Sequence, residues 1–386
     1  MSHSRPVLVV GGSIHYDVIL QLPRLPEDND RLVPTALTLA PGGMGGNVAA
    51  AAARLGAEVR FVGSFSDDED GAALRADLER DGVDTRWAGT RSVEVGRAWR
   101  GLVLVDAEGR RAILGGWPDA DRLERAPGQA PGLTVPVDTA WRKALAPIAL
   151  PAEVFAGENV AFACPFALAP LMLGSVPDAV PVYLDIETGH VSGWSDDEIW
   201  AVLRRTTVLY GNQRTLAAFA RRLDQPSMTA LSRTLRERTT IVETAGDLGC
   251  QIHANGTRTV VPPFPVTAVD STGAGDCFAA ACTVALREGM PVHAAARFAN
   301  AAAALSTRAL GSRPGVPTRE HLDGAMARHD AEAEATPSAA LSPLRGRSRT
   351  PHPHPLLDLV VAPTFVTDGR PDDPNTDLLG RAILHR

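Results

Sequence analysis

The residues Val269 to Leu286 read V-D-S-T-G-A-G-D-C-F-A-A-A-C-T-V-A-L. A glycine-interrupted turn opens this stretch, and the small and apolar residues that follow are typical of a well-packed helix. Gly273 and Gly275 permit backbone conformations closed to other residues and let a ligand approach the main chain. Several backbone N–H groups can therefore point at one place, where the helix dipole adds partial positive charge. The pattern predicts an anion site built on the backbone of Gly273, Ala274 and Gly275.

Asp276 stands in the first turn of this expected helix. A carboxylate beside a phosphate site would be repelled unless it has a chemical task, and the natural task is to accept a proton from a hydroxyl that attacks phosphorus. Such a base needs no raised pKa, because the hydroxyl proton becomes acidic only as the new bond forms. The alternative is an ordinary helix start with an acidic first turn, and spacing alone does not decide between the two.

The composition indicates a globular protein of 386 residues, of which 45% are hydrophobic, in one large domain or two. A net charge of -7 without basic blocks argues against a general nucleic-acid binder. The four cysteines show no metal-ligand spacing, and the start of the chain has no signal-peptide pattern. Prolines and two glutamates interrupt the apolar region at 144–174, so it cannot span a membrane. We expect a cytoplasmic protein that binds neither nucleic acid nor membranes.

Strands and helices alternate along the first 330 residues. Short buried strands are expected at 7–10, 58–63, 160–163, 182–186, 207–212 and 239–243. Helices are expected after the glycine-rich segment at 41–46, before Gly82, after Gly275, at 292–308 and up to about residue 328. A hairpin excursion lies at 98–114. This order predicts a parallel α/β sandwich with a small β lid, and ligands at the carboxyl ends of its strands.

Three segments resemble the ribokinase-like (PfkB) carbohydrate kinases, and the resemblance covers about residues 5–328. The segment D-S-T-G-A-G-D-C-F at 270–278 is similar to the C-terminal signature of that family, and P-G-G-M-G-G-N at 41–47 is similar to its N-terminal signature. The third segment, G-S-I-H-Y-D, ends at Asp17. The resemblance implies a three-layer α/β/α sandwich with a mainly parallel sheet, and lid strands within about 12–40 and 83–116. It also implies that Asp276 is the catalytic base and that the 273–275 backbone is the anion hole.

The same resemblance implies how the substrate is held. Asp17, Gly42, Gly43 and Asn47 match the positions that hold the sugar in the family. From the residues alone, Asp17 could instead close a turn and Asn47 could simply cap a helix. The strand that ends at Gly11-Gly12 does not open a helix, so a dinucleotide-binding site is not expected there. Met44 and Phe166 stand where ribokinases carry polar residues, which suits a more apolar group than ribose.

Nucleotide and metal positions follow from the resemblance as well. The residues implied to bind ATP are Asn212, Thr244, Gly246, Gly249 and Asn300. Asp270 and Thr272 match a monovalent-cation site, so K⁺ activation is expected beside the usual Mg²⁺. The family motif N-x-x-E reads Asn212 to Thr215 here, so its acid is missing. Glu187 and Glu243 are the candidate replacements, and the sequence does not choose between them.

The expected function is transfer of the ATP γ-phosphoryl group to a primary hydroxyl of a ribose-, fructose- or ketodeoxy-sugar-like molecule. One alternative is a nucleoside kinase of the adenosine, inosine or pseudouridine type. Another is a sugar- or nucleotide-binding regulator that has lost catalysis, which the residue Thr215 would favour. The kinase domain is expected at 1–330, followed by a low-complexity, disordered extension at 331–386, and a homodimer is the expected assembly.

Overall fold

The structure is a computed structural model that describes residues 4–91, 100–114, 147–187, 191, 193–235 and 239–335. Within them a nine-stranded sheet has the order β15-β14-β13-β12-β11-β10-β1-β4-β6. Its parallel strands are β1 (Val7–Gly11), β4 (Glu58–Val62), β6 (Val83–Asp84), β10 (Val160–Pro165), β11 (Val182–Ile186), β12 (Val208–Asn212) and β13 (Thr240–Thr244). An antiparallel pair, β14 (Cys250–Ala254) and β15 (Thr257–Val261), completes one edge.

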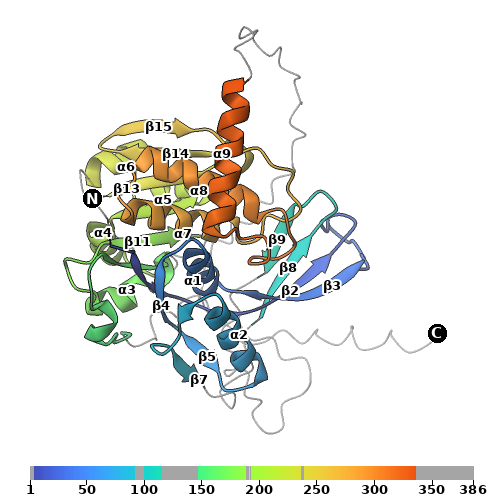
Figure 1. The fold of residues 1–386 in the computed structure, drawn as a ribbon, viewed down its shortest axis with the longest axis horizontal. Helices are drawn as coiled ribbons and strands as arrows, with labels where there is room; N and C mark the ends of the chain where they lie inside the picture. Colours follow the sequence, from blue (N-terminus) through green and yellow to red (C-terminus); the bar gives the residue numbers. More distant parts are fainter. Residues whose placement is uncertain are drawn as a thin grey trace, which may run out of the picture. The chain divides into compact units, whose positions relative to one another are not determined.

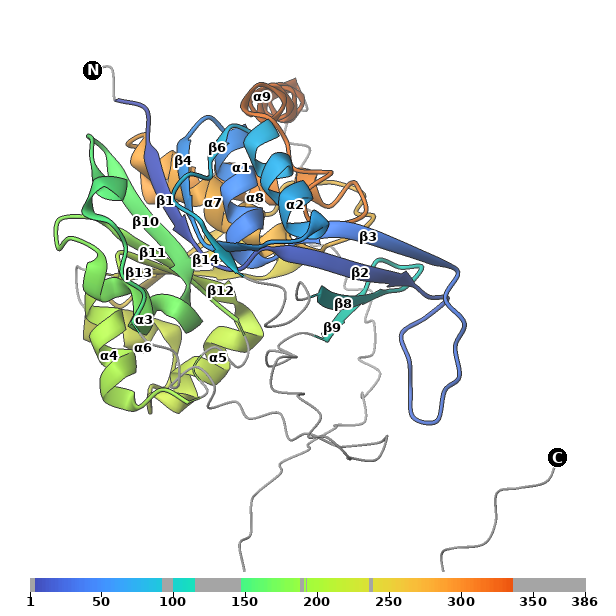
Figure 2. The same ribbon diagram turned by 90° about the horizontal axis from the view of Figure 1, so that it is seen from below.

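Helices cover both faces of this sheet, as Figure 2 shows. One layer consists of α1 (Met44–Arg54), α2 (Glu69–Arg80), α7 (Ala274–Arg287) and α8 (Val292–Ser306), with α9 (Arg319–Ala335) packed on α8. The other consists of α3 (Ala169–Met172), α4 (Asp196–Arg205), α5 (Gln213–Arg222) and α6 (Met228–Leu235). Short 3₁₀ turns lie at 152–155, 166–168, 173–175 and 246–248. The three-layer sandwich expected from the sequence is confirmed.

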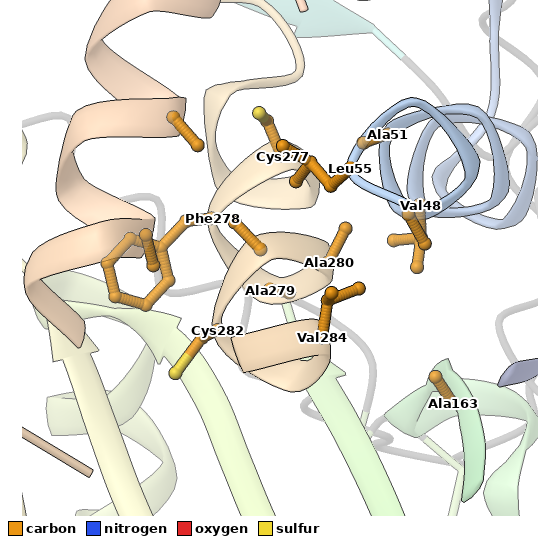
Figure 3. Packing of buried hydrophobic residues seen from close by; sticks show 14 of the residues in the cluster. Val48, Ala51, Leu55, Ala163, Cys277, Phe278, Ala279, Ala280, Cys282 and Val284 are labelled. Carbon is orange, nitrogen blue, oxygen red and sulfur yellow. The ribbon is translucent and has the colours of Figure 1, made fainter. Parts of the chain in front are cut away.

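The two layers follow from the alternation of side chains along buried strands. In β1, Leu8 and Val10 belong to the core beneath α1 and α7, whereas Val7 and Val9 belong to the core beneath α3–α6. Figure 3 shows α1 against α7, with Ala51 and Ala280 between the two helices. Because alanine side chains are small, the helix axes can approach closely, which brings the N-terminal ends of α1 and α7 together.

A second sheet projects from one side of the large one (Figure 1). It has the order β3-β2-β8-β9 and consists of β2 (His15–Gln21), β3 (Ala36–Gly42), β8 (Arg100–Val105) and β9 (Arg111–Leu114). Strands β8 and β9 form the expected hairpin. A short pair, β5 (Ser64–Ser66) and β7 (Gly89–Arg91), lies beside α2. The small sheet is the lid expected within 12–40 and 83–116.

Helix α9 continues to Ala335, so residues 331–335, expected in the C-terminal extension, belong to a helix. The rest of that extension, from residue 336, lies outside the described residues. Among the described residues, no helix is both long enough and apolar enough to cross a membrane.

Candidate active site

Two glycines lie at the N-terminal end of α7, and glycine stands at each position for a different physical reason. Gly273 caps the helix with φ 74°, and a Cβ there would lie 2.7 Å from the Cβ of Ser312. Both the left-handed backbone and the packing therefore require glycine at this position. Gly275 is exposed, and an added Cβ would meet no heavy atom of the described residues within 4 Å. Packing within the protein does not explain Gly275, whose bare backbone faces open space at the positive end of the helix.

Asp276 lies in the first turn of α7 and is only 8% exposed. Burial, followed by the nearby charge of Glu187, raises the pKa of its carboxyl group to about 7. A hydrogen bond from Nδ2 of Asn47 to Oδ2 of Asp276, 2.7 Å long, lowers this pKa in part, as does the positive charge of Arg111. The helix end thus holds a carboxyl group that exchanges its proton near neutral pH, which is the range in which a general base is most effective.

Two more acidic groups approach Asp276 from the end of β11. Burial raises the pKa of Asp185 well above its usual range, and the charges of Asp276 and Glu187 raise it further. Burial also raises the pKa of Glu187, while the charge of Arg111 lowers it. The like charges of these buried carboxyl groups disfavour simultaneous ionisation, so a cation bound nearby would stabilise their ionised forms. Neither acid was among the residues assigned to the site from the sequence, although Glu187 was a candidate replacement for the missing family acid.

Glu243, the other candidate replacement, has a different partner. Its Oε2 lies 3.1 Å from Nε2 of His253, and both side chains are buried. The Nδ1 atom of His253 lies 3.0 Å from the hydroxyl of Thr229, so the three groups form a chain inside the protein. The structure therefore places Glu187, and not Glu243, within electrostatic reach of Asp276.

Arg111 connects the small sheet to the turn before α7. It is the cross-strand partner of Val105, so its side chain lies on the face of the small sheet that buries Val103 and Val105. Its guanidinium group donates a hydrogen bond to the backbone carbonyl of Ser271. Arg111 was not among the site residues predicted from the sequence. The signal that could have indicated it is its place opposite the buried Val105 in the hairpin.

Asp17 lies on β2 between glycines of the two neighbouring strands. A Cβ at Gly42 would lie 2.1 Å from one carboxylate oxygen of Asp17, and a Cβ at Gly101 would lie 2.3 Å from the other. Nε2 of His15 is 3.2 Å from Oδ1 of Asp17. The two glycines make room for a buried carboxylate, which explains Gly42. Gly43 caps α1 with φ 85°, and a Cβ there would lie 2.6 Å from the carbonyl oxygen of Ser13.

The predicted nucleotide residues lie at the carboxyl ends of β12 and β13 and beyond. Asn212 and Thr244 are cross-strand partners, and Asn212 caps α5 by accepting a hydrogen bond of 2.8 Å from the backbone of Thr215. Gly246 and Gly249 have φ 60° and 86° in the loop after β13. Asn300 is only 8% exposed, and its Nδ2 donates to the carbonyl of Pro262 at 2.8 Å. All five residues therefore lie at or near this end of the sheet. Their contact with ATP stays a prediction.

The two residues assigned to a monovalent cation hold the turn together. Asp270 is fully buried, and its Oδ1 accepts hydrogen bonds from the backbone and the hydroxyl of Thr272, at 2.9 and 2.7 Å. Its Oδ2 accepts one from the backbone of Gly311 at 2.8 Å. These bonds fix the turn that precedes α7, and the cation itself stays a prediction.

Among the residues that the structure describes, Phe166 lines no open pocket. Phe166 is fully buried and packs edge-on against Phe219, with ring centroids 5.4 Å apart, in the core beneath α3–α6. Met44 does line a small, mainly apolar cavity between α1, α7 and the strands β1, β10, β11 and β12. The prediction that Phe166 lines the substrate site is therefore wrong, because the 3₁₀ turn that follows β10 directs its side chain into the core.

The chain matches the family model described as "pfkB family carbohydrate kinase" over residues 5–136 and 172–319. It is 29% identical to a ribokinase of Bacillus subtilis over 82% of this chain and 98% of the relative. It is 30% identical to fructokinase-1 of Oryza sativa subsp. japonica over 73% of this chain and 87% of the relative.

Solved structures share the fold. A nucleoside kinase of Methanocaldococcus jannaschii superposes with a TM-score of 0.66 at 16% identity, covering 84% of this chain and 98% of that one. A ribokinase of Arabidopsis thaliana complexed with ribose and ATP superposes with a TM-score of 0.61 at 24% identity, covering 83% and 99%. The family match covers more than half of the chain and includes the motifs around Asp276. The chain therefore belongs to the pfkB family of carbohydrate kinases.

Proposed function

We propose that this carbohydrate kinase transfers the γ-phosphoryl group of ATP to a primary hydroxyl of a small sugar, with Asp276 as the general base. The observation that carries the proposal is the N-terminal end of α7. There a buried carboxyl group with a pKa of about 7 stands beside the open backbone of Gly275. A proton acceptor and an anion site next to each other are what attack of a hydroxyl on a phosphoryl group requires.

The remaining groups divide the work between the two substrates. The backbone N–H groups of 273–275 stabilise charge on the transferred phosphoryl oxygens, because they point from a helix N-terminus. Asp17 and Asn47 orient the acceptor hydroxyl toward Asp276, and Gly42 and Gly43 support them by making room for the Asp17 carboxylate and for the start of α1. The residues Asn212, Thr244, Gly246, Gly249 and Asn300 form the proposed ATP side.

Mg²⁺ is proposed to bind beside the phosphates with help from Asp185 and Glu187. Carboxylate oxygens are suitable ligands, and the mutual repulsion of these buried acids with Asp276 would be relieved by a cation. Among the described residues there is no group of three or more side chains spaced as metal ligands. Water and phosphate would therefore supply the remaining ligands, as is usual for Mg²⁺. When bound, the ion neutralises charge on the phosphates.

The test is ADP release from ATP and Mg²⁺ across ribose, fructose, 2-keto-3-deoxygluconate, adenosine, inosine and pseudouridine. Asp276→Asn should lower kcat by about 10² to 10⁴-fold, since a positioned base contributes that much, with little change in substrate binding. Glu243→Gln serves as a matched acidic control, because Glu243 pairs with His253 and not with Asp276, and it should keep the wild-type rate. Normal turnover by Asp276→Asn would contradict the assignment of the base.

The nucleoside alternative has weaker support than the sugar. The two apolar residues that favoured a nucleobase were Met44 and Phe166, and the burial of Phe166 removes half of that reasoning. Turnover limited to the three nucleosides of the panel would reverse this preference. A regulator without catalysis is disfavoured because Asp276 keeps the surroundings of a working base. Ligand binding without ADP release from any acceptor would favour the regulator.

The assembly is proposed to be a homodimer formed through the small sheet. Alternate residues of its strands leave one face apolar and open to solvent. Leu37, Leu39 and Leu114 are 67%, 43% and 52% exposed on that face, beside the half-buried Val18 and Leu102. A contiguous apolar patch of this kind marks a protein–protein surface.

The kinase domain, expected at 1–330, is proposed to end with α9. A K⁺ ion is proposed to bind near Asp270, and turnover measured with K⁺ against Na⁺ would test this.

A further inference from the structure

Arg313 is a buried cation that the proposed chemistry does not use. It follows α8 in a segment without regular structure and is only 2% exposed. Burial lowers the pKa of its guanidinium group, and the charge of Asp77 opposes that effect. Removing an arginine from water is costly unless its donors are satisfied, so its surroundings require an explanation.

The guanidinium group donates to three different elements. Nη1 donates to Oδ2 of Asp77 on α2 at 2.9 Å, and Nη2 donates to the carbonyl of Gly42 at the end of β3 at 3.0 Å. Nε donates to Oδ1 of Asn47 on α1 at 3.1 Å. The carbonyl of Arg313 accepts a hydrogen bond of 2.6 Å from Arg54, which is itself paired with Asp81. Hydrogen bonds therefore hold both the guanidinium group and the backbone carbonyl of Arg313 in place.

The bond to Asn47 decides which way its amide points. A side-chain amide has an acceptor on one side and a donor on the other, and either could face a given neighbour. A guanidinium group can only donate, so the oxygen of Asn47 must face Arg313. The NH₂ group is then left on the side of Asp276, where it donates to the carboxylate at 2.7 Å. A donor in this place favours the ionised form of Asp276.

Gly46 provides the space for this arrangement. A Cβ at position 46 would lie 2.2 Å from Nη2 of Arg313. The tip of an arginine normally moves aside at little cost, but here a shift would break the bonds to Asn47, Asp77 and the Gly42 carbonyl. Glycine at 46 and arginine at 313 therefore depend on each other, although they lie far apart in the sequence.

We propose that Arg313 is a positioning residue of the kinase, which orients the amide of Asn47 so that its NH₂ group donates to the carboxylate of Asp276, and that Gly46 is glycine to admit the Arg313 side chain. The proposal rests on the proposed role of Asp276 as the base. It adds a chain of contacts that runs from Asp77 through Arg313 and Asn47 to the carboxylate.

The first experiment measures kcat against pH for the wild type and Arg313→Gln. A glutamine side chain can donate or accept, so it no longer dictates the orientation of Asn47. The acidic limb of the kcat profile should move up by about one pH unit, since a hydrogen bond to a charged group is worth about that much. Turnover near neutral pH should fall and recover at higher pH. Arg313→Lys, which can only donate, should restore the wild-type limb. An unchanged limb in Arg313→Gln would overturn the proposal.

The second experiment is a double-mutant cycle with Gly46→Ala. Alone, this substitution displaces the guanidinium group and should shift the limb in the same direction as Arg313→Gln. In the Arg313→Gln background it should add little further shift, because the clash with the guanidinium group is gone and the remaining close neighbour, Ile14 at 3.0 Å, does not contact Asn47 through a hydrogen bond. Additive effects of the two substitutions would contradict the dependence between the positions. If Arg313→Gln does not fold, Gly46→Ala alone still tests the proposal, and an unchanged limb in that variant would overturn it.

Two controls separate a structural role from a positioning role. Asp77→Asn removes the negative charge of the outer partner of Arg313 and should lower the melting temperature while leaving the limb in place. Carboxyl NMR titration, with the Asp276 signal identified by its loss in Asp276→Asn, reads the same pKa without turnover. If Asp276→Asn is fully active, the proposed function fails. If instead the Asp276 titration is identical in wild type and Arg313→Gln, only the role of Arg313 fails.

Discussion

At the scale of single residues, the buried carboxyl group of Asp276 lowers the free energy of unfolding at high pH, and its proposed role as a base explains why it is there. Its carboxyl group has a pKa of about 7 in the folded chain, against an ordinary value of 3.8. Between these values the folded state binds more protons than the unfolded state, so the free energy of unfolding decreases as pH rises through this range. Above about pH 7 the fold holds a buried negative charge, and that charge is the form in which a base can accept a proton.

Asp276→Asn should therefore stabilise the free protein more at high pH than at low pH. The difference corresponds to at most about 4 kcal/mol, from the interval between the two pKa values. Melting temperatures of the wild type and the variant, compared at about pH 5 and pH 8, measure this effect. A gain that is the same at both pH values would contradict the raised pKa.

At the scale of elements, the N-terminal end of α7 makes a matched pair of glycine substitutions informative. Gly273→Ala places a side chain at a positive φ and against Ser312, so it should lower stability by roughly 1–3 kcal/mol. Gly275→Ala introduces a methyl group into open space at a helical position, so its stability should stay within about 0.5 kcal/mol. The same methyl group should lower kcat on the order of 10²-fold by keeping phosphate from the backbone. Chemical denaturation and kcat, measured for both variants, separate these effects. A fully active Gly275→Ala would mean that phosphate does not approach there.

The end of β11 offers a second matched pair. Glu187→Gln should raise the Mg²⁺ concentration needed for half-maximal rate by about 10-fold or more, as loss of a group that supports a metal does. Glu243→Gln should not, because Glu243 is bonded to His253. Rate measured against Mg²⁺ concentration for both variants decides which acid replaces the one missing at Thr215. Equal effects, or an effect in Glu243→Gln alone, would reverse the assignment.

The sequence predicted the strands and helices better than it predicted the contacts between residues of distant segments. Each strand and helix is a continuous pattern of a few residues, and Asp276 stands inside the motif that positions it, so these were predictable. Arg111 reaches the site from the hairpin, Asp185 from the end of β11 and Arg313 from a distant loop, so their neighbours are set by contacts between segments that lie far apart in the sequence. The misplacement of Phe166 has the same origin, since it lies in the 3₁₀ turn after β10, and the direction of its side chain depends on packing against Phe219 that the local sequence does not reveal.

At the scale of the whole molecule, the exposed apolar face of the small sheet predicts the state of assembly. The wild type should have twice the chain mass of 40.7 kDa in light scattering. Leu37→Glu combined with Leu39→Glu should give monomers, because two charges would be buried at the interface. Val33→Glu is the matched control, since Val33 is 76% exposed but lies outside β3. A monomeric wild type, or a dimer unaffected by the double substitution, would exclude this surface.

The contacts between α1, the segment after α8 and α7 also set the order in which a newly made chain becomes an enzyme. Asn47 and Asp276 are 229 positions apart, and Arg313 and Gly42 are 271 positions apart. At translation speeds of about 5–20 residues per second, the ribosome needs roughly ten seconds or more to add the second partner after the first. During that time the nascent chain already has the strands proposed to orient the acceptor but lacks the base. The acceptor-side residues therefore wait in an incomplete site until both Asp276 and Arg313 have been made.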